Sequence, residues 1–148
     1  MAETNFMEMA LAEAELAGSR GEVPVGCVIV RNGEVIARAG NRTLDDRDPT
    51  AHAELLAIRA AAAALGSERL VDCDLYVTLE PCTMCTAAIS FARIRRLYYG
   101  ATDPKGGAVE SGVRFFSQPT CHHRPEIYGG IAEARASAIL KQFFAERR

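Results

Sequence analysis

Two short segments contain the side chains best suited to bind a transition metal. His52 and Glu54 are two positions apart in the run DPTAHAE, and Cys82 and Cys85 are three positions apart in the run LEPCTMC. One imidazole and two thiolates suit zinc, and three protein ligands leave a fourth position for water. Zinc lowers the pKa of such a water to about 7, so that hydroxide forms near neutral pH. We therefore predict that His52, Cys82 and Cys85 bind one zinc ion.

A carboxylate beside the metal but not bound to it can move protons during hydrolysis. Glu54 is the candidate, because it can take a proton from the zinc-bound water and later deliver one to a leaving group. Taken alone, a C-x-x-C pair also fits a redox site or half of a structural zinc site. An H-x-E pair alone also fits a helix cap. Together, with Pro81 before the first cysteine and a helix predicted after each pair, they favour a hydrolytic metal site.

Three further cysteines need an explanation. Cys27 and Cys73 lie in or beside apolar runs and are predicted to be small buried hydrophobic residues. The run Cys121-His122-His123 has no partner pair at zinc-type spacing nearby, so we do not expect a second metal site there. An odd number of cysteines in a chain with no export signal indicates metal chemistry before structural disulfides.

The apolar periodicity and the turn residues divide the chain into alternating helices and strands. Asn32-Gly33 suits a tight hairpin turn, and Thr50 is the expected N-cap of the helix that begins near His52. Predicted helices cover about residues 4–18, 52–65, 82–94 and 131–147. Predicted strands flank the hairpin turn within 25–41 and cover 74–81, 95–101 and 126–128. The glycine-rich stretch between 102 and 125 is expected to contain one short helix or turn around 113–116.

This order predicts an α/β fold of three layers. Strands that alternate with crossover helices become parallel, and helices then cover both faces of the sheet. With 148 residues, of which 49% are hydrophobic, the chain is expected to form one domain over residues 1–148. No run of eighteen apolar residues is present and the N-terminal segment is acidic, so we expect a cytoplasmic protein without a membrane span. The net charge of -2 gives no overall attraction to nucleic acid.

Longer segments around these motifs resemble one enzyme family. EVPVG at 22–26, DPTAHAE at 48–54, LYVTLEPCTMC at 75–85 and YYGATDPKGGA at 98–108 are similar to the zinc-dependent cytidine and nucleobase deaminases. Within that superfamily the chain most resembles the bacterial tRNA-specific adenosine deaminases. The resemblance implies a cytidine-deaminase-like α/β/α domain with a mixed five-stranded sheet. It also implies hydrolysis of an amidine C–N bond, which converts adenosine to inosine at the wobble position of a tRNA anticodon.

The resemblance also implies further site residues and partners. Asn41 would contact the flipped nucleoside, while Val23, Pro24 and the Ala53 backbone would form the wall of the base pocket. Residues that would line the path of the anticodon loop are Asp103, Lys105, His123, Phe143 and Phe144. Most have ordinary alternatives, such as Pro24 in a turn, Asp103 at the start of a loop and the phenylalanines in the core. The family is typically homodimeric, with one zinc ion per subunit and the anticodon stem-loop touching both subunits.

Two other functions remain open from the sequence. The same zinc centre could deaminate a free base or nucleoside such as guanine, cytosine or cytidine. A pocket closed by the C-terminal helix would favour such a small substrate, and an open groove lined by Arg and Lys would favour RNA. The chain could also be a non-catalytic, zinc-stabilised RNA-binding module, but a structural zinc site does not need Glu54 beside it.

Overall fold

A mixed sheet of five strands forms the centre of the molecule. The computed structural model describes residues 2–147, with side chains from residue 6 onward. The strands lie side by side in the order β2-β1-β3-β4-β5. Their bounds are β1 Gly26–Arg31, β2 Glu34–Gly40, β3 Cys73–Leu79, β4 Arg96–Ala101 and β5 Glu126–Tyr128. β1 pairs antiparallel with β2 and β3, whereas β3, β4 and β5 are mutually parallel.

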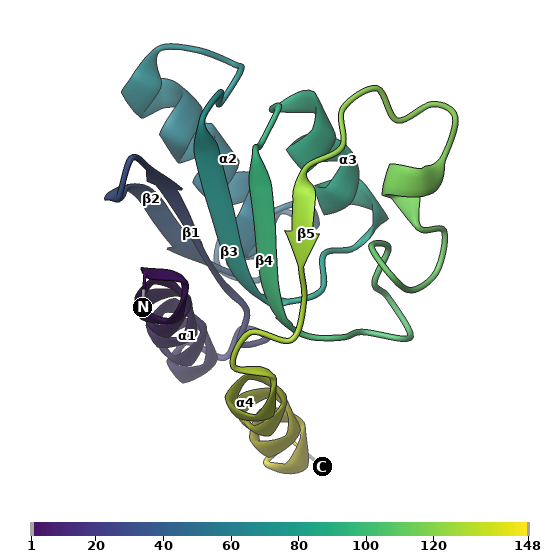
Figure 1. Cartoon of the computed structure of the whole chain (residues 1–148). Coiled ribbons are helices and arrows are strands. Elements are labelled where there is room, and N and C mark those ends of the chain that lie inside the picture. Colours follow the sequence, from purple (N-terminus) through teal and green to yellow (C-terminus); the bar gives the residue numbers. More distant parts are fainter. Residues whose placement is uncertain (1, 148) are drawn as a thin grey trace.

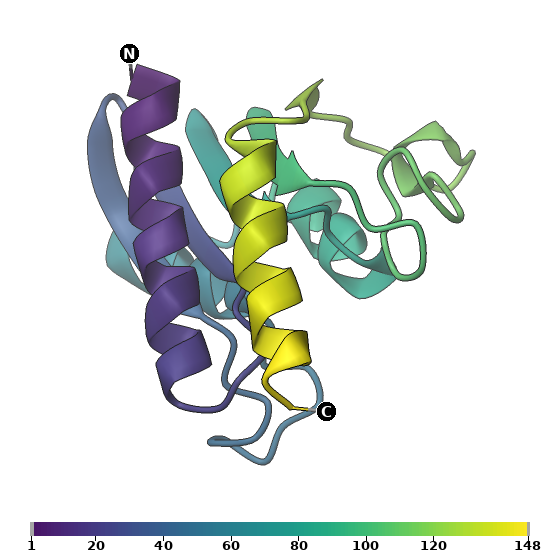
Figure 2. The same cartoon turned by 90° about the horizontal axis from the view of Figure 1, so that it is seen from below.

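Helices cover both faces of this sheet. Their bounds are α1 Ala2–Ser19, α2 Ala53–Leu65, α3 Thr83–Phe91 and α4 Glu133–Ala145, and a short 3₁₀ helix spans Phe115–Ser117. Figure 1 shows α2 and α3 behind the sheet and α1 and α4 on the opposite side. In Figure 2 α1 and α4 run next to each other, and an ion pair between Arg135 and Glu8 connects them. The predicted three-layer α/β/α fold with a mixed five-stranded sheet is therefore confirmed.

The period-two alternation of the strands separates the core into two clusters. Cys27 and Ile29 of β1 pack with the alanines of α2 on one face of the sheet. Val28 and Val30 pack with Met7 and other residues of α1 on the other face. Successive side chains of a strand point to opposite faces, so one buried strand contributes to both clusters. The prediction that Cys27 and Cys73 are buried is confirmed.

The hairpin turn has the predicted geometry. Asn32 and Gly33 adopt φ angles of 52° and 78°, the left-handed conformation that a type I′ turn requires at both central positions. Among the described residues, no helix combines the length and the apolar character needed to cross a membrane.

The start of α2 differs from the prediction. Thr50 is not its N-cap, because Asp48 Oδ1 accepts hydrogen bonds from the Thr50 amide at 2.9 Å and from its hydroxyl at 2.7 Å. This local turn keeps Thr50 outside the helix. α2 begins at Ala53, and His52 occupies the cap position. The imidazole therefore lies at the very start of the helix.

The last helix is shorter than predicted. The Ile131 amide donates to the Tyr99 carbonyl oxygen at 3.0 Å, so the chain is still attached to β4 at the predicted first residue of the helix. Ala132 follows with a left-handed φ of 57°, and α4 begins at Glu133. Within the 102–125 stretch, the one helix is the 3₁₀ helix at Phe115–Ser117. It overlaps the short helix or turn predicted around 113–116.

Candidate functional site

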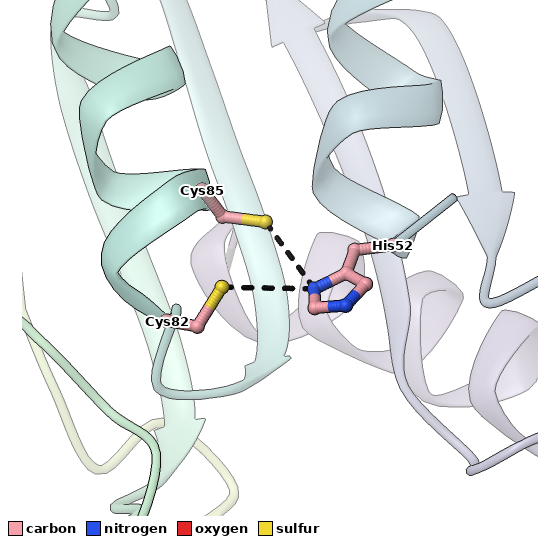
Figure 3. Close-up of side chains that lie close together, drawn as sticks. All are labelled: His52, Cys82 and Cys85. Atoms are coloured by element: carbon pink, nitrogen blue, oxygen red, sulfur yellow. Dashed lines mark hydrogen bonds between the residues drawn. The ribbon is translucent and has the colours of Figure 1, made fainter. Parts of the chain in front are cut away.

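The three predicted metal ligands converge between the starts of α2 and α3. The Nδ1 atom of His52 lies 3.7 Å from Cys82 Sγ and 3.6 Å from Cys85 Sγ. Figure 3 shows Cys82 and Cys85 at the start of α3 facing the imidazole of His52 at the start of α2. These side chains form a group whose ligand atoms all lie within 4.8 Å of one another. Among residues 6–147, whose side chains the structure describes, no fourth metal-binding side chain joins this group.

The spacing of the three ligand atoms fits zinc. Bonds of about 2.3 Å to sulfur and about 2.05 Å to nitrogen, at the tetrahedral angle, place these atoms about 3.6 Å apart. The two sulfur–nitrogen distances, 3.7 and 3.6 Å, agree with this value. The donor set of one imidazole and two thiolates is also one that zinc takes in catalytic sites. The structure therefore has a site of the right size and chemistry for one zinc ion.

Backbone geometry at the helix starts explains why these side chains can meet. His52 and Cys82 are the N-cap residues of α2 and α3, and both have extended φ and ψ angles. For neither residue does the side chain form a capping hydrogen bond, unlike the usual capping side chain. Both are therefore available to the metal. Cys85 follows one turn into α3, where it is buried on the same side as Cys82.

Glu54 lies next to this group but is not part of it. Its side chain is 4% exposed, and burial raises the pKa of its carboxyl group to about 7. A carboxyl group with a pKa near neutrality can both accept and donate a proton at physiological pH. A hydrogen bond from the Cys85 thiol lowers the pKa of Cys82 to about 4. The same bond, with burial, raises the pKa of Cys85.

A cavity of about 340 Å³ opens beside the ligand group. Its walls contain His52, Glu54 and Cys82 together with Val23, Val25, Asn41, Thr43, Leu79, Glu80, Asp103 and Gly106. The structure thus brings the metal group, Glu54 and the predicted substrate residues Val23, Asn41 and Asp103 to one cavity.

Asn41 connects two walls of this cavity. Its Nδ2 group donates to the Val23 carbonyl at 3.1 Å, and its Oδ1 atom accepts the Ala53 amide at 2.9 Å. The Ala53 amide is one of the unpaired N–H groups at the start of α2. Asn41 therefore fixes the segment at Val23 relative to the helix that contributes His52.

A second cavity of about 490 Å³ adjoins the first. The two cavities share Val23, Leu79 and Asp103 as walls. The second is completed by Thr102, Lys105 and two α4 residues, Leu140 and Phe144. The predicted residues Lys105 and Phe144 are therefore close to the metal cavity but do not line it.

Three predicted substrate residues lie elsewhere. Phe143 is 8% exposed and lines a cavity between α1 and α4 with Pro24, whereas its neighbour Phe144 is 50% exposed. Adjacent residues on a helix point in different directions, which explains this contrast. His123 Nε2 donates a hydrogen bond to the Ile94 carbonyl oxygen at 2.7 Å. Ile94 follows the C-terminal end of α3, whereas Cys82 lies at the N-terminal end of that helix. None of these three residues lines the metal cavity.

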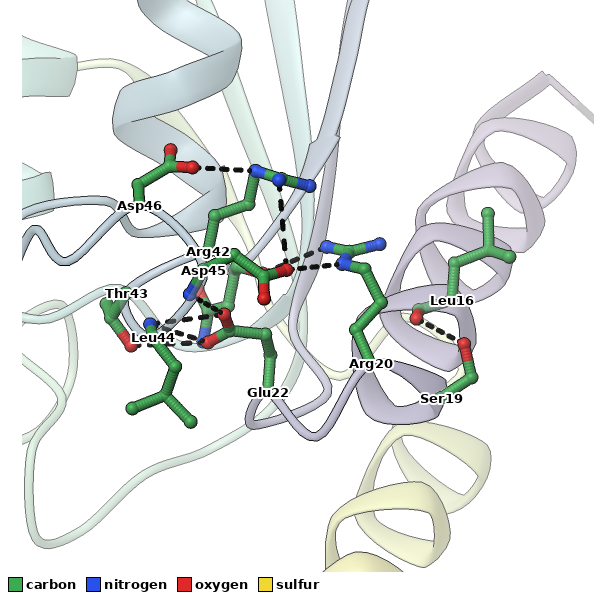
Figure 4. A network of polar contacts seen from close by, with 10 residues as sticks. Leu16, Ser19, Arg20, Glu22, Arg42, Thr43, Leu44, Asp45 and Asp46 are labelled. Atoms are coloured by element: carbon green, nitrogen blue, oxygen red, sulfur yellow. Dashed lines mark hydrogen bonds and ion pairs between the residues drawn. The ribbon is translucent and has the colours of Figure 1, made fainter.

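Two buried carboxylates were not anticipated from the sequence: Glu80 lines the metal cavity, and Glu22 precedes the wall residue Val23. Glu22 is 1% exposed and accepts hydrogen bonds from the Leu44 and Asp45 amides and from the Thr43 hydroxyl. Figure 4 shows this network, which attaches the loop after β2 to the chain that follows α1. Glu80 binds the amides of a different loop in a similar way. The only sequence signal for either residue is a charge next to an apolar run.

The electrostatics of Glu80 differ from those of Glu54. Burial raises the pKa of the Glu80 carboxyl group. Hydrogen bonds from the Asp103, Ser111 and Val109 amides and from the Ser111 hydroxyl outweigh this effect, so the pKa lies below its usual value. Glu80 therefore remains ionised near neutral pH and accepts hydrogen bonds, whereas Glu54 is suited to exchange a proton.

Comparison with known proteins identifies several similar chains. The family model described as the cytidine and deoxycytidylate deaminase zinc-binding region matches residues 1–101. The tRNA-specific adenosine deaminase of Agrobacterium fabrum is 70% identical over 145 residues, covering 98% of this chain and 95% of that protein.

Solved structures of similar proteins also include deaminases. One, from work on A-to-I editing by tRNA deaminases at the wobble position of transfer RNA, is 70% identical. It superimposes with a TM-score of 0.91 and covers 93% of this chain and 99% of its own. A guanine deaminase from Bacillus subtilis is 35% identical, with a TM-score of 0.65, and covers 97% of this chain and 92% of its own.

Replacing Asn41 tests its connecting role. Asn41→Ala leaves the Ala53 amide and the Val23 carbonyl without their partner, which we expect to lower the free energy of unfolding by about 1–3 kcal/mol. Asn41→Asp retains an acceptor for the Ala53 amide and loses only the donor to Val23, so its effect on stability should be smaller. Urea denaturation of the zinc-loaded variants measures both. Unfolding midpoints equal to wild type in both variants would contradict this role.

Proposed function

Because the chain belongs to the cytidine and deoxycytidylate deaminase family defined by its zinc-binding region, we propose that it converts adenosine to inosine at the wobble position of a tRNA anticodon. The reaction is hydrolysis of the amidine C–N bond with release of ammonia. The chain is a zinc-dependent deaminase, and its high identity to a tRNA-specific enzyme over nearly the full length supports the RNA substrate.

The observation that most favours RNA is the pair of adjoining cavities. No α4 residue lines the cavity beside the metal group, so the C-terminal helix does not close it. Instead, Leu140 and Phe144 of α4 extend the space into the second cavity, next to Lys105. A site for a free base buries most of a small ligand, whereas this arrangement continues past the first cavity. A wobble base in the first cavity would leave room for a neighbouring nucleotide in the second.

We propose distinct roles for the residues at the centre. His52, Cys82 and Cys85 hold the zinc ion, which when bound acts as a Lewis acid that lowers the pKa of a coordinated water. Glu54 would accept a proton from the attacking water and deliver one to the departing amino group. Burial supports this role, because it places the pKa of Glu54 at about 7.

The substrate residues follow from the cavity walls. Val23 and Asn41 contact the base in our proposal, and Asp103, Lys105 and Phe144 contact the adjacent nucleotide. The Ala53 backbone does not line the cavity, and its role is to hold Asn41 through its amide. Pro24, Phe143 and His123 line neither of the two substrate cavities, so we do not propose them as substrate contacts. Both core clusters pack on one sheet, which supports a single zinc-dependent deaminase domain over residues 1–148.

The choice of substrate is directly testable. We expect the zinc-loaded protein to release ammonia and form inosine from an anticodon stem-loop with adenosine at the wobble position. A stem-loop with guanosine at that position is the matched control and should release none. Free adenosine, guanine, cytosine and cytidine are assayed in parallel. Ammonia release from guanine without turnover of the stem-loop would favour the alternative suggested by the Bacillus subtilis guanine deaminase.

The role of Glu54 predicts a separation of metal binding from turnover. Glu54→Ala should keep one zinc ion per chain and remain folded, while turnover falls by about 100-fold to 10,000-fold because general acid–base catalysis is lost. Cys85→Ala should instead lose zinc and thermal stability together. Metal analysis, thermal melting and stem-loop deamination measure these outcomes. Activity of Glu54→Ala within about tenfold of wild type would exclude the proton-transfer role.

We also propose that the protein forms a homodimer through α2 and α3. Their outer surface is poor in charge: the exposed residues are Arg59, Ala60, Ala63, Ala64, Thr83 and Phe91, the last 71% exposed. Exposed residues of α1 and α4 include several charged side chains. A surface with few charges and an exposed aromatic side chain is typical of interfaces between subunits. A dimer would also place basic residues of two chains near one substrate.

Because the proposed substrate is tRNA, we propose a cytoplasmic location.

The dimer proposal predicts a selective effect of charge at Phe91. Phe91→Asp should shift the protein from dimer to monomer, because a carboxylate would have to be buried in the interface. Leu16→Asp is the control, since Leu16 is 54% exposed on α1, on the opposite face of the sheet. Sedimentation velocity measures the species present. A monomeric wild type, or an unchanged dimer in Phe91→Asp, would contradict the proposal.

A further inference from the structure

Glu80 is a buried carboxylate for which the proposed reaction has no use. It directly follows β3, and its side chain is 2% exposed. Its amide donates to the Ala101 carbonyl at 2.8 Å, which fixes its backbone where β3 and β4 end. An ionised carboxylate is buried in proteins only where hydrogen bonds or charges compensate for the lost water.

The compensation comes entirely from one segment, residues 102–111. Oε1 accepts the Asp103 amide at 2.9 Å and the Ser111 hydroxyl at 3.0 Å. Oε2 accepts the amides of Val109 at 3.0 Å, Glu110 at 2.9 Å and Ser111 at 2.9 Å. One carboxylate therefore binds both ends of the segment. Hydrogen bonds to a charged acceptor are stronger than those between neutral groups.

The middle of the segment packs against the same carboxylate. A Cβ atom on Gly107 would lie 2.4 Å from Glu80 Cδ, so only glycine fits at this position. Gly107 also pairs with Cys82 in an isolated antiparallel bridge, and the Ala108 amide donates to the Pro81 carbonyl at 2.8 Å. The segment thus lies against the chain that leads into the cysteine pair.

This segment presents its outer residues to the substrate cavities. Asp103 lines both cavities, and Lys105 lines the second. Asp103 Oδ1 accepts the amides of Lys105 at 3.2 Å and Gly106 at 3.0 Å. The position of the Asp103 backbone, which Glu80 holds, therefore determines the turn on which Lys105 lies.

We infer that Glu80 is a positioning residue that holds the 102–111 segment as the wall between the two substrate cavities. This inference rests on the proposed function, because it assumes an RNA substrate that extends into both cavities. Glu80 then acts through Asp103 and Lys105, without touching the reacting atoms. A wall held in place before binding saves the substrate the cost of ordering it.

A purely electrostatic role makes the opposite prediction. A negative charge near RNA repels phosphate, so neutralising Glu80 would strengthen binding if charge were its only effect. A positioning role predicts weaker binding, since Glu80→Gln has the same shape but cannot accept all five hydrogen bonds. The direction of the change in KM therefore distinguishes the two roles.

The experiment compares wild type, Glu80→Gln and Ser111→Ala, all zinc-loaded, in deamination of the adenosine-wobble stem-loop. For Glu80→Gln we expect KM to rise about tenfold, kcat to change by less than about threefold and zinc to remain at one per chain. Ser111→Ala removes one of the five hydrogen bonds and should raise KM by a smaller factor. Hydrogen exchange should become faster at the amides of residues 103 and 109–111, while amides 75–77 of β3 stay unchanged.

Glu110→Gln is the matched control. Glu110 belongs to the same segment, but its exposed side chain contacts Tyr99 and not Glu80, so this variant removes one charge without releasing the wall. Its exchange pattern should equal that of wild type. A KM for Glu80→Gln within about twofold of wild type, unchanged exchange at 103 and 109–111, or loss of zinc would overturn the inference. Failure of wild type to deaminate the stem-loop would instead overturn the proposed function, and the exchange measurement would still test how Glu80 holds the segment.

Discussion

The convergence of one imidazole and two sulfur atoms is the constraint on which the rest of the structure depends. These atoms come from residues about thirty positions apart in the chain, and their separations of 3.6 and 3.7 Å leave little tolerance. The sheet provides the necessary accuracy. The crossover from β3 through α3 to the parallel strand β4 fixes where the cysteine pair begins. The antiparallel pairing of β1 with both β2 and β3 places the start of α2 opposite that pair.

Local sequence signals were sufficient to predict this centre and the fold around it. The two short spacings, the proline before Cys82 and the Asn32-Gly33 turn each depend on residues close together in the chain. Alternation of apolar residues predicted the strands in the same way. The element boundaries were less accurate where tertiary contacts compete, as at Thr50, which Asp48 captures, and at Ile131, which stays bound to β4.

The cavity walls could not be predicted in this way. Glu22 binds amides 22 and 23 positions further along the chain, and Glu80 binds amides 23 to 31 positions further along. The donors are backbone groups, which every residue possesses and which leave no mark in the sequence. The position of His123 was not predictable for the same reason. Its family resemblance suggested an RNA contact, whereas its position results from a hydrogen bond to a distant carbonyl oxygen.

The two faces of the sheet contribute different residues to the site. The metal ligands and Glu54 belong to the α2–α3 layer, whereas Leu140 and Phe144 reach the adjoining cavity from the α4 layer. The two cavities therefore lie between the two hydrophobic clusters, and Leu79, which lines both cavities, packs against both clusters. Repacking of α4 against α1 can change the shape of the outer cavity while the metal ligands keep their places. Substitutions in α4 can thus alter the outer cavity without moving the residues that hold the metal.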